Sequence, residues 1–196
     1  MVVVQHTGEV LFPRFEEFSH HTLNVGRFGV TVFFLVSGFV IPMSIERAAA
    51  SPRSEALKSF WIGRVSRLYP MYWVSLAAVL LLSVVDSSAL SPEFREHTAI
   101  NALANVTMVQ ELLGRPHAVG LYYTLTLELL FYVLCSVLFA FGLLRQSVRN
   151  AWWGIGLCAV AAVVPFALDR RVPFAACFYL TSMLIGTVVA RAMAGA

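Results

Sequence analysis

The chain has 196 residues and a net charge of +3; 59% of its residues are hydrophobic and only 13% are charged. A soluble domain carries roughly 25% charged residues, because its surface faces water. This composition, with a mean hydropathy of +0.76, excludes an ordinary soluble domain and predicts an all-α, polytopic transmembrane helical bundle in a lipid bilayer. The excess of Lys and Arg is typical of cytoplasmic loops, so we do not expect the chain to bind nucleic acid.

The chain begins with a short apolar stretch. Residues 1–4 (Met-Val-Val-Val) precede Gln5 and His6, which is too few for a span of about 20 residues and resembles the last turns of a helix. No basic region or cleavage site follows, which argues against a signal peptide. Residues 7–27 are polar enough to predict a loop, and residues 28–45 are the first predicted span.

Residues 46–68 are the most basic segment, and we predict a loop there on the cytoplasmic side. From Phe60 the pattern is amphipathic, and Arg64 and Arg67 are spaced to share one face of a helix. These two residues are either anchors on the cytoplasmic side or a clamp for a phosphorylated ligand. The second interpretation follows because guanidinium groups bind phosphate oxygens in a bidentate manner.

Aromatic residues follow this basic segment. Tyr69, Tyr72 and Trp73 predict an interfacial aromatic belt, and Pro70 among them predicts the start of a helix. Residues 71–85 are the next predicted span.

Four apolar segments occupy the rest of the chain, at residues 99–113, 121–144, 151–168 and 174–193. The first is short and contains two Asn, one Gln and one Glu, so it is a half-helix or a re-entrant segment as readily as a span. Both alternatives place eight basic residues on the cytoplasmic side and six on the other, so the charge rule does not choose between them and the topology after residue 100 stays open.

Two ionisable side chains lie in apolar surroundings. Glu128 falls inside a predicted span, where a charge is costly, so it is either a satisfied structural group or a chemical one. Thr124, Thr126 and the neighbouring tyrosines are its candidate hydrogen-bond partners. His6 is either a hydrogen-bonded core residue or, because its pKa is near neutrality, a proton acceptor.

The cysteines and the remaining histidines predict no metal site. Cys135, Cys158 and Cys177 lie in apolar stretches without close spacing, which indicates small buried hydrophobic residues. His20 and His21 are adjacent, and no ligand spacing is completed around them.

Three motifs occur in order along the chain. They are residues 29–39 (Gly-Val-Thr-Val-Phe-Phe-Leu-Val-Ser-Gly-Phe), residues 60–73 with Arg64-x-x-Arg67-Leu-Tyr-Pro-x-Tyr-Trp73, and residues 123–132 (Tyr-Thr-Leu-Thr-Leu-Glu-Leu-Leu-Phe-Tyr). In this combination the chain resembles the acyltransferase type 3 family, membrane enzymes that O-acylate sugars of lipopolysaccharide, peptidoglycan, exopolysaccharide and antibiotics. Residues 178–186 also look like a later helix of that family.

The resemblance implies a single transmembrane acyltransferase domain over residues 1–196, in the cell (inner or plasma) membrane. The family fold has about ten helices and this chain has about six helices or helix fragments, so we expect an incomplete domain that is truncated at both ends. In the family, the first helix carries an Arg followed after ten residues by a His. His6 fits that His, and the Arg falls before Met1.

The resemblance also implies a site and its substrates. Acyl-coenzyme A, for example acetyl-coenzyme A, would be the donor substrate, with no permanently bound cofactor, and a sugar, glycan or glycolipid hydroxyl would be the acceptor. His6 would take the proton of the acceptor hydroxyl or handle the acyl group, and Glu128 would orient His6 or bind the sugar. The residues expected to bind substrate are Arg64, Arg67, Tyr69, Tyr72, Trp73 and Ser37.

Two other functions remain open from the sequence. A proton-coupled transporter or exporter would use Glu128 and His6 equally well, although the two halves of the chain show no internal repeat. A non-catalytic remnant is the other alternative, if the truncation leaves no closed site. The sequence does not indicate an oligomeric state.

Overall fold

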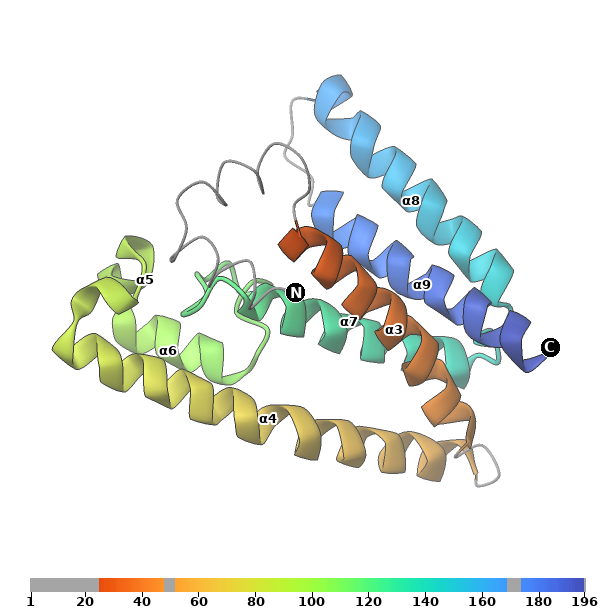
Figure 1. Cartoon of the computed structure of the whole chain (residues 1–196), viewed down its shortest axis with the longest axis horizontal. Helices are drawn as coiled ribbons and strands as arrows, with labels where there is room; N and C mark the ends of the chain where they lie inside the picture. The colour runs from red at the N-terminus through yellow and green to blue at the C-terminus, as the bar shows by residue number, and fades with distance from the viewer. Residues whose placement is uncertain (1–24, 48–51, 169–173, 196) are drawn as a thin grey trace. The chain divides into compact units, whose positions relative to one another are not determined.

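The computed structural model describes residues 25–47, 52–168 and 174–195, which form helices joined by turns and include no strand. The predicted all-α fold is therefore confirmed for this part of the chain. In chain order the elements are α3 (Val25–Arg47), α4 (Arg53–Val85), the short 3-10 helix η2 (Ser87–Ala89), α5 (Pro92–Glu96), α6 (Thr98–Val106), α7 (Tyr122–Ala140), α8 (Ser147–Leu168) and α9 (Phe174–Ala194) (Figure 1).

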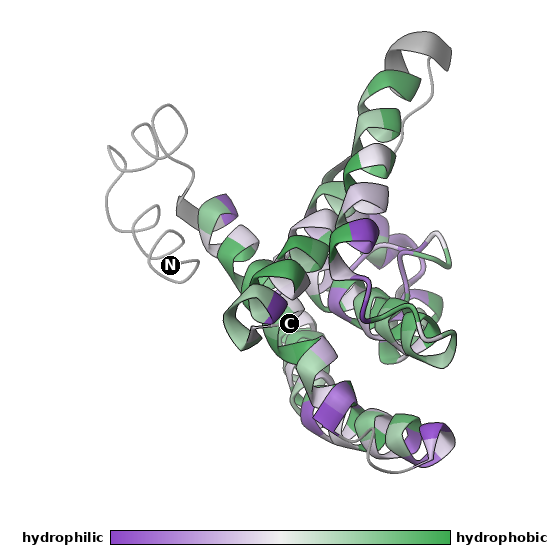
Figure 2. Cartoon of the chain, turned by 90° about the vertical axis from the view of Figure 1, so that its right-hand side faces the viewer, coloured by the Kyte–Doolittle hydropathy of each residue, from purple (hydrophilic) through white to green (hydrophobic). Residues whose placement is uncertain are grey.

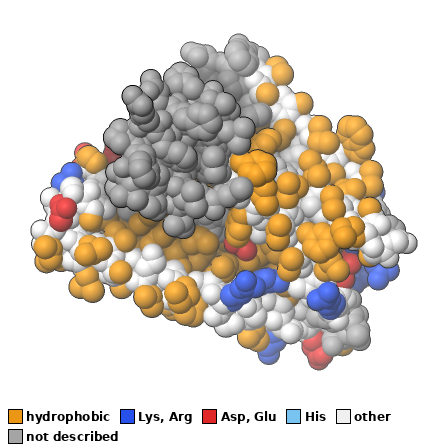
Figure 3. All heavy atoms as spheres, viewed as in Figure 1, with side chains coloured by type: hydrophobic (Ala, Val, Ile, Leu, Met, Phe, Trp, Pro, Cys, Tyr) orange, Lys and Arg blue, Asp and Glu red, His pale blue; other side chains and the backbone are white. Residues whose placement is uncertain are grey.

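Five of the described helices, α3, α4, α7, α8 and α9, are long and apolar enough to cross a membrane. Hydrophobic residues predominate along them (Figure 2) and are spread widely over the described surface in Figure 3, where Lys and Arg gather over the first part of α4. At the end of α4, Val84 and Val85 are 84% and 90% exposed. Such surface is unfavourable in water and ordinary in lipid, which agrees with a multi-pass membrane protein.

Helix α4 corrects two predictions. The predicted loop at residues 46–68 is wrong from Arg53 onward, and Pro70 does not start a helix but lies inside α4. Buried residues of α4 lie on both sides of Pro70, with Phe60 before it and Tyr72 and Leu76 after it. Packing on both sides of the proline offsets the one backbone hydrogen bond that it removes, so the helix continues.

The chain divides into two compact units. The first combines residues up to Met43 with residues from Val137 onward, and the second is the continuous stretch Ser44–Ser136. The expected single domain over residues 1–196 stays a prediction.

In the first unit, α3 and α9 touch backbone to backbone. A Cβ atom added to Gly38 would lie 1.9 Å from the backbone oxygen of Met183, and one added to Gly186 would lie 2.2 Å from that of Leu35. Two glycines therefore permit this crossing, as small residues do in membrane helices generally. Helix α8 packs along the same α9 (Figure 1).

In the second unit, α6 and α7 follow one another along α4. Trp73 of α4 contacts Val106 at the end of α6, Ser75 contacts Tyr122 at the start of α7, and Trp61 contacts Ser136 further along α7. Helix α7 therefore runs antiparallel to α4, and residues 107–121 interrupt the path between α6 and α7. At 1.5 Å per residue α6 is only about 14 Å long. The segment at residues 99–113 therefore contains a half-helix and does not span the membrane.

These helix lengths predict the topology that the sequence left open. If α3, α4, α7, α8 and α9 each cross once, the α3–α4 loop, the α7–α8 loop and the end of α9 share one side. We expect a membrane-impermeant thiol reagent added from one side to label Ser54→Cys and Gln146→Cys together, and Ser88→Cys only from the other side, in a background without native cysteines. Labelling of Gln146→Cys together with Ser88→Cys would contradict this topology.

The glycine crossing predicts a second outcome. Gly186→Ala forces its new methyl group against the backbone of α3, and such overpacking costs about 1–3 kcal/mol. We expect a lower midpoint of thermal unfolding in detergent for Gly186→Ala and for Gly38→Ala. Gly156→Ala on α8 is the matched control, because a Cβ there meets nothing within 4 Å; an equal loss in all three variants would refute the crossing as the cause.

Candidate functional site

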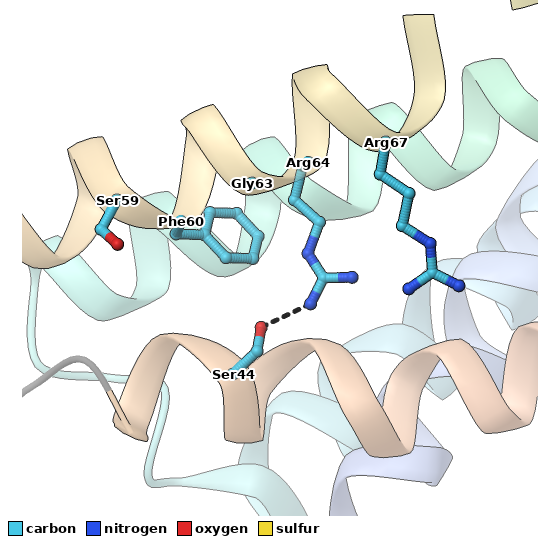
Figure 4. Close-up of a pocket in the computed structure, with 6 residues that line it drawn as sticks. All are labelled: Ser44, Ser59, Phe60, Gly63, Arg64 and Arg67. Atoms are coloured by element: carbon cyan, nitrogen blue, oxygen red, sulfur yellow. Dashed lines mark hydrogen bonds between the residues drawn. The ribbon is translucent and has the colours of Figure 1, made fainter. Parts of the chain in front are cut away.

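A pocket of about 320 Å³ opens beside the first part of α4, lined by Ser44, Ser59, Phe60, Gly63, Arg64 and Arg67 (Figure 4). All of these residues except Ser44 come from one face of α4, where positions three and four apart are neighbours. Gly63 borders open space, since a Cβ atom added there would meet nothing within 4 Å. The described lining thus holds two cations and no acidic side chain, which suits an anionic ligand.

Arg64 is held in place from several directions. Its Nη2 donates a hydrogen bond of 2.7 Å to the Ser44 hydroxyl (Figure 4). Its guanidinium carbon lies 5.3 Å from the ring centroid of Phe60 and 5.5 Å from that of Tyr132. Both distances are within the range of a cation–π interaction, so the side chain is ordered before any ligand arrives.

Arg67 differs from Arg64. Its guanidinium reaches the same pocket (Figure 4), is exposed, and makes no hydrogen bond or ion pair with a residue that the structure describes. Its donors are therefore available to a ligand. The predicted shared face of the two arginines is confirmed, and their surroundings distinguish them.

Glu128 lies on α7 and is 8% exposed. Tyr132, one helical turn further on and 1% exposed, donates a hydrogen bond from its hydroxyl to Glu128 Oε1. A tyrosine is thus the partner that the sequence predicted among several candidates. Thr124 and Thr126 bond to backbone carbonyls instead, so they are not partners of this carboxylate.

The polar atoms of Tyr69, Tyr72 and Trp73 donate hydrogen bonds to backbone carbonyls at the end of α6. The Tyr72 hydroxyl donates to the Asn105 carbonyl at 2.6 Å, the Trp73 indole to Val106 at 3.0 Å, and the Tyr69 hydroxyl to Thr107 at 3.1 Å. The last carbonyls of a helix have no partner within it, so α4 supplies partners from outside. These bonds give the three aromatic residues a structural role. Their expected role in binding substrate stays a prediction.

The chain between α6 and α7 is held by further polar side chains. Asn105 is fully buried; its amide nitrogen donates to the carbonyls of Asn101 and Pro116, and its oxygen accepts from the backbone of Ala118. The Thr126 hydroxyl donates to the carbonyl of Met108, whose φ of 64° is unusual for a residue with a side chain. The polarity of this segment, noted in the sequence, thus reflects a break in the helical path.

His117 in this break packs against Gln110 and Glu111. Its Nδ1 lies 2.6 Å from the Gln110 amide nitrogen, and its Nε2 lies 3.7 Å from the Glu111 carboxylate. Burial lowers the pKa of His117, and the nearby Glu111 opposes that shift in part. The imidazole is therefore neutral near pH 7 and accepts from the Gln110 amide.

The structure leaves two predicted site residues untested. His6 lies outside the described residues, as do His20 and His21. Ser37 is buried on α3 in the first unit, next to the Gly38 crossing, and its expected role in substrate binding stays a prediction. The sequence did not predict that Ser44 and Tyr132 contact Arg64. Both contacts depend on packing between helices, about which the motifs carry no information.

The fold and the pocket define a helical membrane protein with an arginine-lined site beside a buried carboxylate. A family model described as an acyltransferase domain matches residues 1–194. The chain therefore belongs to the acyltransferase type 3 family, as its three motifs indicated.

Two curated relatives show similarity to the chain. Acyltransferase MdmB of Streptomyces mycarofaciens is 28% identical over 157 residues, which cover 76% of this chain and 38% of the relative. Peptidoglycan O-acetyltransferase OatA of Listeria monocytogenes serovar 1/2a is 37% identical over 59 residues, covering 30% of this chain and 10% of the relative. The chain thus spans well under half the length of these relatives. No solved structure matches it.

The bonds from α4 to α6 predict a stability effect. Tyr72→Phe removes a buried donor to the end of α6, and we expect a loss of about 1–2 kcal/mol in unfolding free energy. Tyr69→Phe removes a more exposed donor, so we expect it to lower the unfolding free energy by less; it serves as the comparison. Unfolding in detergent measures both, and an unchanged Tyr72→Phe protein would contradict the importance of this contact.

Proposed function

We propose that the protein is a membrane-bound O-acyltransferase that moves an acyl group from acyl-coenzyme A to a hydroxyl of a sugar, cell-surface glycan or glycolipid. The observation that carries the proposal is the pocket with Arg64 and Arg67 and without an acidic residue among its described lining. Family membership and the printed names of the two relatives, an acyltransferase and a peptidoglycan O-acetyltransferase, support the same class of reaction.

The two arginines suit the phosphates of the donor. Guanidinium groups bind phosphate oxygens through paired, charge-assisted hydrogen bonds. Arg64 is already ordered by Ser44 and two aromatic rings, whereas the donors of Arg67 remain available within the described chain. Donor binding would therefore depend on Arg67 for new contacts and on Arg64 for a fixed charge.

The transfer itself joins the acceptor oxygen to the thioester carbonyl carbon. The bond from that carbon to sulfur breaks, the acceptor hydroxyl loses its proton to a base, and coenzyme A leaves as a thiol once a proton returns to its sulfur. His6 is the proposed base. Glu128, which Tyr132 contacts, is proposed to orient His6 or to bind the sugar.

The proposed location is the cell membrane, with the basic first part of α4 on the cytoplasmic side, where acyl-coenzyme A is made. Lys58, Arg64 and Arg67 all lie in the first half of α4, and positively charged segments remain on the cytoplasmic side. The donor would then reach the pocket from that side.

The test uses membranes that contain the protein, radiolabelled acetyl-coenzyme A and total cell-surface glycan as acceptor. We expect label in an alkali-labile ester of the glycan fraction, and loss of that label in the His6→Ala protein. Undiminished transfer by His6→Ala would remove His6 as the base. Uptake of label into vesicles without an ester product would favour a transporter and contradict the proposal.

Arg67 gives the sharpest prediction for the donor. Arg67→Ala removes charge-assisted hydrogen bonds worth about 1.5–3 kcal/mol, so the KM for acetyl-coenzyme A should rise about tenfold or more. Lys58→Ala removes the same charge from the same helix at a position that does not line the pocket and serves as the matched control. Equal KM values for the two variants would argue against phosphate binding at Arg67.

A further inference from the structure

Tyr132 contacts both halves of the proposed site. Its ring lies under the guanidinium of Arg64, with 5.5 Å from the guanidinium carbon to the ring centroid. Its hydroxyl donates to the carboxylate of Glu128. Among the described residues no ion pair joins Arg64 directly to Glu128, so Tyr132 is the side chain through which the two charges are connected.

The surroundings of Tyr132 leave it little freedom. The ring is 1% exposed and stands edge-on to Phe60 at 5.7 Å and to Trp61 at 6.3 Å between centroids. Trp61 is itself held by a hydrogen bond from its indole to Ser136. The hydroxyl of a ring fixed in this way is also fixed in place, and its hydrogen is used in the bond to Glu128.

A buried carboxylate needs such a partner, because an unpaired charge in a low-dielectric interior is costly and would draw the side chain elsewhere. The cation above the ring and the anion at the hydroxyl also favour each other across the phenol, since networks of this kind are stronger in a low-dielectric medium. The contact therefore fixes where the carboxylate lies relative to the cation of the pocket.

We propose that Tyr132 is a positioning residue that holds Glu128 at a fixed place relative to the Arg64 pocket. This inference rests on the proposed function, in which the donor binds at Arg64 and Arg67. The hydroxyl and the ring have separate tasks: the hydroxyl positions the carboxylate for the transfer step, and the ring supports Arg64 for donor binding.

Two substitutions separate these tasks. Tyr132→Phe keeps the ring and removes the hydroxyl, so we expect turnover to fall about tenfold to a hundredfold, as for other misplaced catalytic groups, with the donor KM within about twofold of wild type. Tyr132→Leu removes the ring as well, so the KM for acetyl-coenzyme A should also rise. The assay measures release of coenzyme A from acetyl-coenzyme A in membranes that supply the glycan acceptor.

The link to Glu128 is tested by a double-mutant cycle. Glu128→Gln and Tyr132→Phe should each lower turnover, and the double variant should be no slower than the slower single variant. Tyr122→Phe is the matched control, because it removes a phenol hydroxyl from the same helix that contacts Ser75 rather than Glu128; its turnover should equal that of wild type.

A spectroscopic readout does not depend on the acceptor. We expect the infrared carboxyl bands of the wild-type protein to change when coenzyme A is added. The change should be absent in Glu128→Gln, which identifies the group, and absent in Tyr132→Phe. Wild-type turnover in Tyr132→Phe, additive effects in the double variant, or an unaltered infrared change in Tyr132→Phe would each overturn the positioning role while the donor site stands. Failure of coenzyme A to bind the wild-type protein would instead overturn the proposed donor, and the positioning role with it.

Discussion

The second unit depends on one constraint, which is that a polar group beside a membrane-spanning helix must find a partner within the protein. Helix α6 ends alongside α4, and its last carbonyls have no hydrogen-bond partner within α6 itself, so they need donors from elsewhere in the protein. Three aromatic side chains of α4 meet it by donating to Asn105, Val106 and Thr107. Because these donors lie within two turns of α4, they fix where the helical path breaks and hence where α7 begins beside Ser75.

The same constraint explains the arrangement of charge. Arg64 opposes the middle of α7 and is surrounded by a serine hydroxyl and two aromatic faces. Glu128 has a tyrosine hydroxyl on one oxygen. Neither charge is neutralised by a direct ion pair with the other, so each retains capacity for a ligand. A structural salt bridge would have removed that capacity, which is why this arrangement favours a binding site over a purely structural role.

The class of the fold and the shared face of the two arginines were predictable from local pattern. Apolar length identified the spans, and a spacing of three placed Arg64 and Arg67 on one face of a helix. The course of α4 through Pro70 was not predictable, because the usual preference of proline for a helix start was overridden by burial of Phe60 before it and Tyr72 after it. Pairings such as Tyr72 with Asn105 and Ser44 with Arg64 join residues far apart in the sequence, and periodicity within one segment carries no information about them.

The crossing of α3 and α9 has a consequence for the order of folding. Gly38 and Gly186 lie nearly 150 positions apart, so at roughly 5–20 residues per second α3 waits on the order of ten seconds or more after its own synthesis before α9 exists. The stretch Ser44–Ser136 is continuous, so all of its residues have been synthesised before α9 begins. Until α9 is made, the surface of α3 around Gly38 lacks the helix that covers it in the folded protein.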